Sequence, residues 1–437
     1  MLANPTMTGS RNLRLFTIMM LYVAQGIPIG LLEFAIPAWM AANGATGAEI
    51  GYVIGMGGIP WSLKFFNGAL MDRYAYLPMG RRRGWLIGAQ AAMVLALIAC
   101  AWIGPGPRDA TVLGLIALVV SAAVVFQDVA ADALAVDIAE PGERGFTGGL
   151  MSGGQALGIS LSAAVAGSVI YFLGIGAAYA GCAALMLLVT AYLVWVRERD
   201  GERRLPWSDG CTHADCLALQ ARSWWELVRE AFRHLFRRDS IIWIGPLFLK
   251  GTIYGYMTVA VPLIAANYAG WNEAELGSAN GIAQLAAALA TISLGGYLTT
   301  RMGAKSFQIW SIAAFAAALV AYLSLQDHWA SGSMMAVLVV GWTVLYFLLS
   351  APQGAISMMF CHPKTGATQF SIYMAFVNQG ISFAGFTYAF IEGFGGVQVV
   401  LSVLVALLVL AILLVLLIRL PETGSVAAGS EPAMAHS

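Results

Sequence analysis

Apolar runs of about 20 residues follow one another along most of this chain, and that length suits a helix crossing a bilayer. Hydrophobic residues make up 59% of the 437 residues and charged residues only 11%, against about 25% charged residues in a soluble domain. This composition argues against nucleic-acid binding and soluble enzymology. We predict an all-α integral membrane protein with twelve spans, at 13–40, 47–71, 84–104, 111–138, 145–173, 175–196, 241–267, 273–300, 305–325, 333–360, 366–391 and 395–419.

Lysine and arginine gather at one end of these predicted spans, while the opposite end carries only Arg108. Because positively charged loops remain in the cytoplasm, we expect both termini and the long loop 197–240 to be cytoplasmic. This loop divides the spans six and six. The predicted units are an N-terminal bundle (1–196), a linker (197–240) with a basic amphipathic helix at 222–239, a C-terminal bundle (241–421) and a cytoplasmic tail (422–437).

The two halves share a motif at the start of their second span. Ala48-Glu49-Ile50-Gly51-x-x-x-Gly55 corresponds to Ala274-Glu275-Leu276-Gly277-x-x-x-Gly281. A polar residue, Thr46 or Asn272, stands three positions before the glutamate in each copy, which predicts a helix start closed by a capping box. Two similar halves joined by a loop are typical of transporters built from parallel repeats.

Three carboxylates in the predicted spans are candidates for proton coupling: Glu33, Asp128 and Asp132. Asp128 and Asp132 are four apart and therefore share a helix face. A charge at mid-bilayer costs at least ~2.5–3.5 kcal/mol, so an ionisable residue there is functional by default. A carboxylate in a low-dielectric cavity can exchange protons near neutral pH. The alternative is that these charges only pair and hold helices together.

Two lysines also fall inside predicted spans. Lys64 has nearly the same depth as Asp128, so an ion pair with Asp128 or with Asp132 is geometrically possible. Lys250 has no carboxylate close in sequence. It either pairs across the halves with Glu33 or Asp128, or it meets an anionic substrate group.

Several polar side chains in the spans either line a substrate cavity or hold helices together. The stretch 25–30, which contains Gly and Pro, and the stretch 251–255, which contains two Gly, add hinge-like interruptions in the first and seventh spans, which are typical of carriers. The candidate cavity residues are Gln25, Lys64, Gln127, Lys250, Tyr254, Gln353, Asn378 and Gln379.

Opposite charges face each other on two neighbouring loops at the basic end. We interpret them as a cytoplasmic gate, in which each exposed ion pair stabilises the closed gate by about 0–1 kcal/mol. The alternative is that these charges only set the membrane topology. The predicted gate residues are Asp72, Arg73, Arg81, Arg82, Arg83, Asp137, Glu143 and Arg144. Elsewhere, Cys211-x-His213-x-x-Cys216 has metal-ligand residue types, but its spacing matches no zinc pattern, so we expect neither metal nor cofactor.

Gly68-x-x-x-Asp72-Arg73 followed by Gly80-Arg81-Arg82-Arg83 resembles the loop between the second and third spans of the major facilitator superfamily. The longer stretch KFFNGALMDRYAYLPMGRRRGW, together with Gln25-Gly26-Ile27-Pro28 and Gln127-Asp128-x-x-x-Asp132, resembles the AmpG-type muropeptide permeases and the acetyl-coenzyme A transporters. Siderophore importers and drug carriers are among their relatives. The resemblance is firm over about 20–160.

The resemblance implies two six-helix bundles around a central cavity lined by spans 1, 4, 7 and 10, with alternating access driven by the proton gradient. It implies that Asp128 and Asp132 face the cavity, while Asp72, Arg73 and Asp137 belong to the inner gate.

We therefore predict a proton symporter of the bacterial inner membrane that imports a mid-sized polar or anionic solute. A muropeptide is the first candidate and a siderophore the second; a proton antiporter exporting an amphipathic drug is the alternative. We expect a monomer whose partners are a small solute, protons and the bilayer, without nucleic acid. We expect no enzyme, because the histidines fall in loops, span ends or the tail, at His213, His234, His328, His362 and His436.

Overall fold

The computed structural model describes residues 6–140, 143–214, 216, 229, 236, 238–361 and 366–420. Its elements are helices, apart from an isolated β-bridge between Thr6 and Arg197. The amphipathic helix expected at 222–239 and the tail expected at 422–437 lie almost entirely outside the described residues, so they remain predictions.

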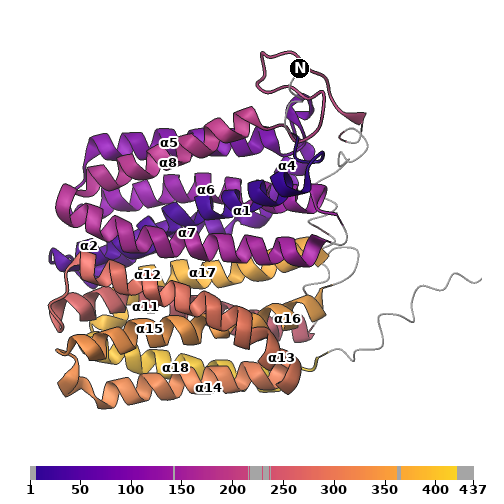
Figure 1. The fold of residues 1–437 in the computed structure, drawn as a ribbon. Coiled ribbons are helices and arrows are strands. Elements are labelled where there is room, and N and C mark those ends of the chain that lie inside the picture. Colours follow the sequence, from indigo (N-terminus) through magenta and orange to yellow (C-terminus); the bar gives the residue numbers. More distant parts are fainter. Residues whose placement is uncertain are drawn as a thin grey trace, which may run out of the picture.

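The helices form two groups that lie against each other in Figure 1, one from each half of the chain. The first half contains α1 (Arg11–Gly30), η1 (Leu31–Ala35), α2 (Ile36–Ala42), α3 (Gly47–Ser62), α4 (Lys64–Arg73), η2 (Leu77–Met79), α5 (Arg83–Ile103), α6 (Ala110–Ile138), α7 (Arg144–Leu173) and α8 (Ile175–Trp195). The second half contains α11 (Arg238–Asn267), α12 (Glu273–Ala290), η4 (Thr291–Gly295), α13 (Gly296–Met302), α14 (Ala304–Ser324), η5 (Gln326–His328), α15 (Gly332–Leu348), α16 (Ser350–Phe360), α17 (Gly366–Glu392) and α18 (Gly396–Leu417).

The all-helical membrane class is confirmed. Ten helical segments among the described residues are long and apolar enough to cross a bilayer. The two other expected spans, 47–71 and 366–391, are represented by α3 with α4 and by α17, which are not among those ten. The helix of the second span is interrupted at Leu63, between α3 and α4.

Both predicted capping boxes are confirmed. The Thr46 hydroxyl accepts the Glu49 backbone N–H at the start of α3, and the Glu49 carboxylate accepts the Thr46 backbone N–H. Asn272 and Glu275 make the same reciprocal pair at the start of α12. Each box satisfies backbone donors that a helix N-terminus otherwise leaves unpaired, so the halves repeat this local structure.

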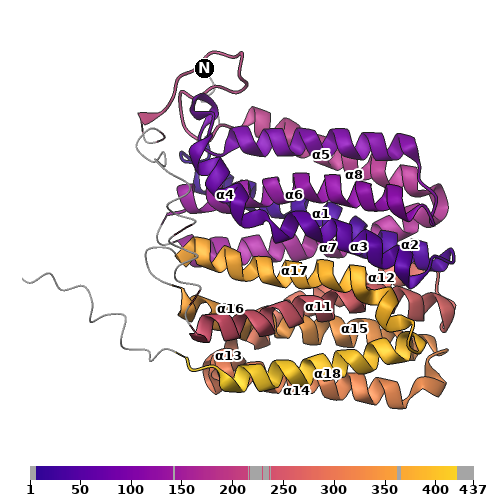
Figure 2. The same cartoon turned by 180° about the vertical axis from the view of Figure 1, so that it is seen from behind.

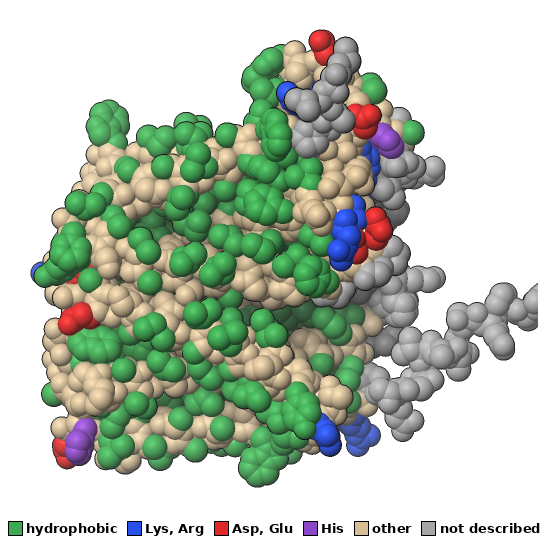
Figure 3. Space-filling view, viewed as in Figure 1, with side chains coloured by type: hydrophobic (Ala, Val, Ile, Leu, Met, Phe, Trp, Pro, Cys, Tyr) green, Lys and Arg blue, Asp and Glu red, His purple; other side chains and the backbone are tan. Residues whose placement is uncertain are grey.

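The charged side chains of the described residues gather at the two ends of the bundle, and the flank between them is mostly apolar (Figure 3). We call the end that holds Arg11, Arg81 and Lys305 the basic end, and the other, where α2, α11 and α14 finish, the opposite end. An apolar flank between charged ends is what a helical bundle in a bilayer requires.

The two halves contact each other mainly along two helix pairs, α3 with α17 and α7 with α12. Figure 1 shows α7 beside α12, and Figure 2 shows α3 beside α17. Gly51 and Gly385 allow a close approach, because a Cβ on either residue would collide with the backbone carbonyl of the other. Other close contacts of these pairs, such as Gly167 against Glu273, lie toward the opposite end, while those of Gly58 with Ser382 and of Gly281 with Ser160 lie farther along the same helices. The halves are therefore packed together at that end.

Toward the basic end the halves separate on the side of α7, although α4 of the first half still contacts α17 of the second. Figure 3 shows a hollow between α7 and the second half on that side. The cavity described next lies at mid-depth, between this hollow and the packed opposite end.

Candidate functional site: a cavity between the halves

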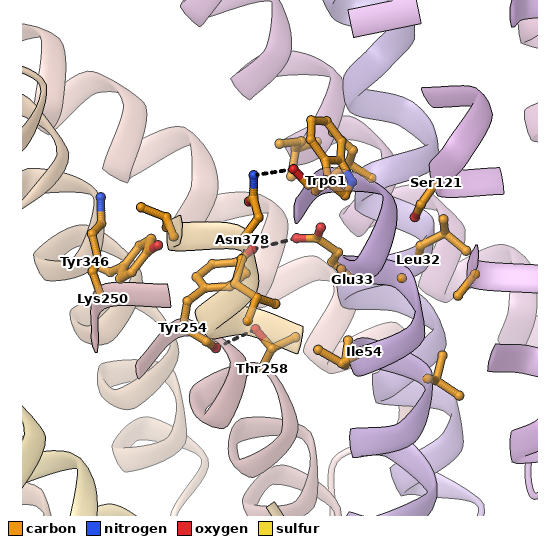
Figure 4. A pocket seen from close by; sticks show the side chains of 18 of the residues that line it. Leu32, Glu33, Ile54, Trp61, Ser121, Lys250, Tyr254, Thr258, Tyr346 and Asn378 are labelled. Carbon is orange, nitrogen blue, oxygen red and sulfur yellow. Dashed lines mark hydrogen bonds between the residues drawn. The ribbon is translucent and has the colours of Figure 1, made fainter. Parts of the chain in front are cut away.

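A cavity of about 240 Å³ lies where the two halves meet. Side chains from α1, η1, α3, α6 and α7 line one wall, and α11, α15, α16 and α17 line the other. Four residues predicted for the site lie on it: Glu33, Lys250, Tyr254 and Asn378 (Figure 4). The lining therefore includes the first, fourth, seventh and tenth spans, as the resemblance implied, and also the second, fifth and eleventh.

Helix α11 presents a stripe of three residues to the cavity, Lys250, Tyr254 and Thr258. They are four residues apart, so they stack on one helix face. The Lys250 ammonium donates a hydrogen bond to Ser350 Oγ over 2.7 Å, and its Nζ lies 4.8 Å from the centre of the Tyr346 ring. Within the described part of the chain, no carboxylate pairs with Lys250.

Glu33 reaches across the interface from the first half. The Tyr254 hydroxyl donates a hydrogen bond of 2.8 Å to Glu33 Oε2, drawn in Figure 4. Glu33 lies in η1, one π-helical turn inside an otherwise α-helical segment, and such turns occur frequently at functional sites. The Tyr254 ring packs against Tyr346, with centroids 4.8 Å apart, and against Trp342 at 5.8 Å.

Sequence reasoning missed part of this wall. Tyr346, Ser350 and Trp61 line the cavity, yet none stood out in an apolar span. Tyr346 and Ser350 are four residues apart in the sequence and therefore share a helix face. This spacing could have pointed to them, but the local sequence does not show which face of the helix points into the cavity. Asn378 also links the halves, because its side-chain N–H donates to the Trp61 carbonyl over 3.3 Å.

A second cluster of ionisable residues lies within the first half. Lys64 Nζ is 3.3 Å from Asp128 Oδ2, and the Gln25 amide donates to Asp128 Oδ1. The Tyr22 hydroxyl donates to Asp132 Oδ1. Of the two ion pairs left open by the sequence, the structure contains the one with Asp128.

Asp128 and Asp132 are not among the residues that line the cavity, although the resemblance implied that they face it. Ser121, on the same helix face, does line it. Asp128 is seven residues farther along α6 toward the basic end, about 10 Å at 1.5 Å per residue. Lys64, 5.8 Å from the centre of the Trp61 ring, lies beside a residue of the cavity wall.

Other predicted cavity residues also lie off the lining. Gln127 is buried and donates to the Leu21 carbonyl over 2.8 Å, which joins α6 to α1. Gln353 is buried in α16, and its side-chain oxygen has no hydrogen-bond partner among the described residues. Gln379 is partly buried in α17. Like Gln25 and Lys64, these three are not part of the cavity wall.

At the basic end, the predicted gate residues form ion pairs within the first half. Asp137 accepts hydrogen bonds from Arg82 Nε at 2.8 Å and from Arg81 at 3.1 Å. Glu143 pairs with Arg14 and Arg11, each at 2.9 Å. In this conformation these pairs fasten elements of one half to each other and do not join the halves.

Arg83 is fully buried and serves as a structural anchor. Its guanidinium donates to the backbone carbonyls of Met79, Leu193, Arg203 and Arg204. It thereby ties the start of α5 to the end of α8 and to the beginning of the linker. Arg73 is exposed and lies 5.6 Å from the centre of the Tyr74 ring, while the side chains of Asp72 and Arg144 lie outside the described set.

The first part of the linker packs a buried polar cluster against the loop before α5. Glu198 accepts the backbone N–H groups of Arg81 and Arg82 and pairs with the Arg199 guanidinium. Arg199 also donates to Cys216 Sγ over 3.3 Å. Burial and the neighbouring Glu198 raise the pKa of Glu202 from 4.5 to about 7.

Glu198, Glu202 and Cys216 are close enough to share a metal ion. The Arg199 guanidinium, however, already contacts Glu198 and Cys216, and burial raises the Cys216 pKa to about 11. A metal needs the thiolate form, so this cluster fits an arginine-centred ion pair better than a metal site.

A cavity that holds ionisable groups between two similar helical halves defines a membrane transporter. The sequence model of the Major Facilitator Superfamily matches residues 18–386, and the chain belongs to that superfamily.

Two relatives carry AmpG-type names. The "Anhydromuropeptide permease" of Escherichia coli (strain K12) is 30% identical over 164 residues, which cover 36% of this chain and 33% of that protein. This match thus spans about a third of the relative's length. The "Putative transporter AmpG 4" of Rickettsia conorii is 23% identical over 375 residues, covering 83% of this chain and 86% of the relative.

Other similarities extend to other solutes and to the fold. The "Folate-biopterin transporter" of Synechocystis sp. is 30% identical over 187 residues, 41% of this chain and 37% of that protein. The crystal structure of the nucleoside transporter NupG superimposes with a TM-score of 0.68 at 15% identity, covering 92% of this chain and 97% of that one. This last likeness concerns the fold alone.

Proposed function

We propose that this transporter is a proton-coupled symporter that imports a polar or anionic solute across the bacterial inner membrane. The observation that carries the proposal is the Lys250 ammonium on the cavity wall, held by Ser350 and the Tyr346 ring without a carboxylate partner in the described chain. A buried charge without a counter-ion is costly. An anionic group of the solute supplies the missing partner.

The distribution of charge indicates to which side of the membrane the present conformation opens. Positively charged loops remain in the cytoplasm, so the basic end is taken as cytoplasmic and the opposite end as periplasmic. The halves are packed together at the opposite end through Gly51 and Gly385. The present conformation then corresponds to a carrier closed to the outside, from which solute and proton leave inward.

Asp128 and Asp132 support proton coupling. Both carboxylates are held inside the first half by hydrogen-bond donors, Gln25 and Tyr22, and Lys64 neutralises Asp128. Asp132 has no cation within ion-pair distance among the described residues, which leaves it as the member of the pair free to take up a proton. It lies between the cavity and the basic end, on the path that a released proton follows to the cytoplasm.

An anhydromuropeptide is the first solute to test, because a similar protein bears that name. The cavity of about 240 Å³ is smaller than the roughly 300–1,000 Å³ of sites that hold a drug-sized ligand. A solute of that size therefore requires the halves to separate further during binding. A smaller anion of the folate or pterin kind, suggested by another relative, is the next candidate.

The test is uptake of radiolabelled anhydromuropeptide into right-side-out membrane vesicles with an imposed pH gradient, acid outside. We expect accumulation by the unchanged protein, loss of accumulation in Lys250→Met, and partial retention in Lys250→Arg. Lys305→Met is the matched control, since Lys305 caps backbone carbonyls at the basic end. Gradient-driven accumulation in inside-out vesicles instead would favour the antiporter that exports an amphipathic drug. Full uptake by Lys250→Met would contradict the anion role.

A further inference from the structure

A second, smaller cavity lies beside the central one, on the side of the opposite end. Its volume is about 10 Å³, and Glu33, Thr258 and Asn280 bring polar groups to its wall. We call it the outer cavity. Roughly 10–15 Å³ is the least that holds one water molecule, and a dehydrated sodium ion is smaller than water. Neither the anion site at Lys250 nor the proton site at Asp132 uses this cavity.

Oxygen atoms reach the outer cavity from both halves of the protein. Glu33, from the first half, accepts the Tyr254 hydroxyl through Oε2 over 2.8 Å. Its other carboxylate oxygen has no hydrogen-bond partner among the described residues. Thr258, from the second half, donates its hydroxyl proton to the Tyr254 carbonyl over 2.8 Å (Figure 4), which leaves the lone pairs of its own oxygen free.

Pro262 makes a further oxygen available, because it cannot donate a hydrogen bond. It lies inside α11, and a proline there has no N–H for the carbonyl four residues earlier. That carbonyl belongs to Thr258. It points along the helix toward position 262, and both residues line the outer cavity, so the freed carbonyl lies on that face. Backbone carbonyls left free by interrupted helices coordinate sodium in several kinds of carrier.

Asn280 of α12 points independently to a ligand. Its side chain is only 3% exposed, lines the outer cavity and makes no hydrogen bond within the described part of the chain. Burial of an amide without a partner costs about 1–3 kcal/mol. The indole nitrogen of Trp342, another lining residue, is enclosed by protein atoms and does not open onto the cavity. An occupant of the outer cavity therefore meets oxygen atoms and the Asn280 amide.

The charge of the lining decides the kind of occupant. Glu33 is the only charged residue on this wall, and it forms no ion pair in the part of the chain that the structure describes. A buried carboxylate without a cation is costly. A water molecule would leave its charge uncompensated, and a divalent ion would exceed it. Hard cations bind carboxylate, carbonyl and amide oxygens, so a small monovalent cation fits this wall.

We propose that the outer cavity binds a sodium ion through the Glu33 carboxylate, the hydroxyl and carbonyl of Thr258 and the side-chain oxygen of Asn280. Glu33 belongs to the first half and the other ligands to the second. The ion therefore favours the conformation in which the opposite end is packed, because only that conformation brings its ligands together. This inference goes beyond the proposed function and depends neither on the solute nor on the proton.

The test measures binding of radioactive sodium to the purified full-length protein in detergent, without a solute or a pH gradient. Choline is the inert cation, and a buffer at about pH 8 limits competition from protons for the carboxylate. For the unchanged protein we expect saturable binding that potassium, a larger ion, displaces poorly. The melting temperature should rise with the sodium concentration, because a ligand of the folded state stabilises it by mass action.

Matched variants identify the ligands. Thr258→Val removes the hydroxyl from the cavity wall, and its control Thr252→Val removes a hydroxyl that bonds within α11 away from this wall. Pro262→Ala returns an N–H to the Thr258 carbonyl, and its control Pro246→Ala makes the same change elsewhere in α11. Thr258→Val and Pro262→Ala should each weaken sodium binding by at least about tenfold, as loss of even an outer partner of a metal ligand does. Both controls should bind sodium like the unchanged protein.

Two further variants remove the remaining ligands. Glu33→Gln takes away the charge and should abolish binding, and Asn280→Leu should weaken it as Thr258→Val does. Melting curves in choline show that each variant is folded. The inference is overturned if the unchanged protein binds no sodium saturably, or if Thr258→Val and Pro262→Ala bind it as tightly as their controls. Failure of anhydromuropeptide uptake with sodium binding intact would instead overturn the proposed solute and leave this inference standing.

Discussion

Lys64 Nζ lies 3.3 Å from Asp128 Oδ2, and the two side chains are only 17% and 7% exposed. The pair joins α4 to α6 inside the first half and does not cross the interface. Removing one member of a buried pair leaves the other charge uncompensated, at a cost of about 3–5 kcal/mol. Lys64 and Asp128 therefore have a structural role that any mutational study of coupling has to separate from proton transfer.

The first prediction concerns stability. Asp128→Asn should destabilise the protein by about 3–5 kcal/mol because Lys64 loses its counter-ion, whereas the double variant Asp128→Asn with Lys64→Met should recover most of that loss. Unfolding in detergent, followed by circular dichroism, measures both. If the double variant is no more stable than the single one, the ion pair is not what Asp128 contributes.

The second prediction separates Asp132 from its neighbour. Asp132→Asn keeps the Lys64–Asp128 pair and an acceptor for the Tyr22 hydroxyl, so we expect normal insertion and stability. Uptake driven by a pH gradient should be lost, while exchange of labelled for unlabelled anhydromuropeptide without a gradient should persist. Full gradient-driven uptake with an unchanged pH profile would remove Asp132 from the coupling mechanism.

The third prediction concerns the packed opposite end. A Cβ on Gly385 would lie 2.5 Å from Gly51 O and from Gly55 N. Gly385→Val should therefore destabilise the packed arrangement of this crossing by about 1–3 kcal/mol and favour opening of the opposite end. In that background, the thiol of Val53→Cys should react faster with an impermeant thiol reagent added from outside. Gly153→Val is the control, because nothing lies within 4 Å of a Cβ there. Equal reactivity in both variants would contradict the assignment of this crossing as the closed gate.

The fourth prediction concerns pH and the linker. The pKa of Glu202 is raised from 4.5 to about 7 by burial and by Glu198. A raised pKa in the folded state means that the folded protein binds the proton on Glu202 more tightly than the unfolded chain does. The contribution of Glu202 to the free energy of unfolding is therefore greatest below about pH 4.5 and is lost as the pH rises through about 7. Glu202→Gln mimics the protonated form and should be more stable above about pH 7, on the order of 1 kcal/mol.

Hydrogen exchange at the backbone amides of 199–204, recorded at about pH 5 and about pH 8, checks this effect after correction for intrinsic exchange rates. Asp200→Asn, at an exposed position in the same segment, is the matched control and should keep the pH dependence of the unchanged protein. The same pH dependence in Glu202→Gln would show that another group is responsible.

Much of the fold was predictable because its signals are local. The capping boxes at Thr46 and Asn272 were read from four residues each, and both are present. The apolar runs predicted the membrane class in the same way. The break at Leu63 in the second span was not predicted, although Pro60 precedes it by three residues and the polar Ser62 and Lys64 flank it.

The candidate site was only partly predictable. Glu33, Lys250, Tyr254 and Asn378 were selected as polar residues in apolar spans, and all four line the cavity. The same argument selected Gln127, which instead bonds to the Leu21 carbonyl beside another helix. Periodicity shows which residues share a helix face, but the direction of that face depends on how the helix is rotated against its neighbours.

The sequence by itself determined that this protein is a helical membrane transporter of two similar halves, because hydrophobic length, capping and the spacing of charges act over a few residues. Only the tertiary structure decided that Lys64 neutralises Asp128 and that Tyr254 contacts Glu33, 221 positions away. Such pairings depend on how each helix is rotated and on how the two halves are packed in this conformation. The distinction matters physically, because a contact between halves changes during transport while a contact within one half persists.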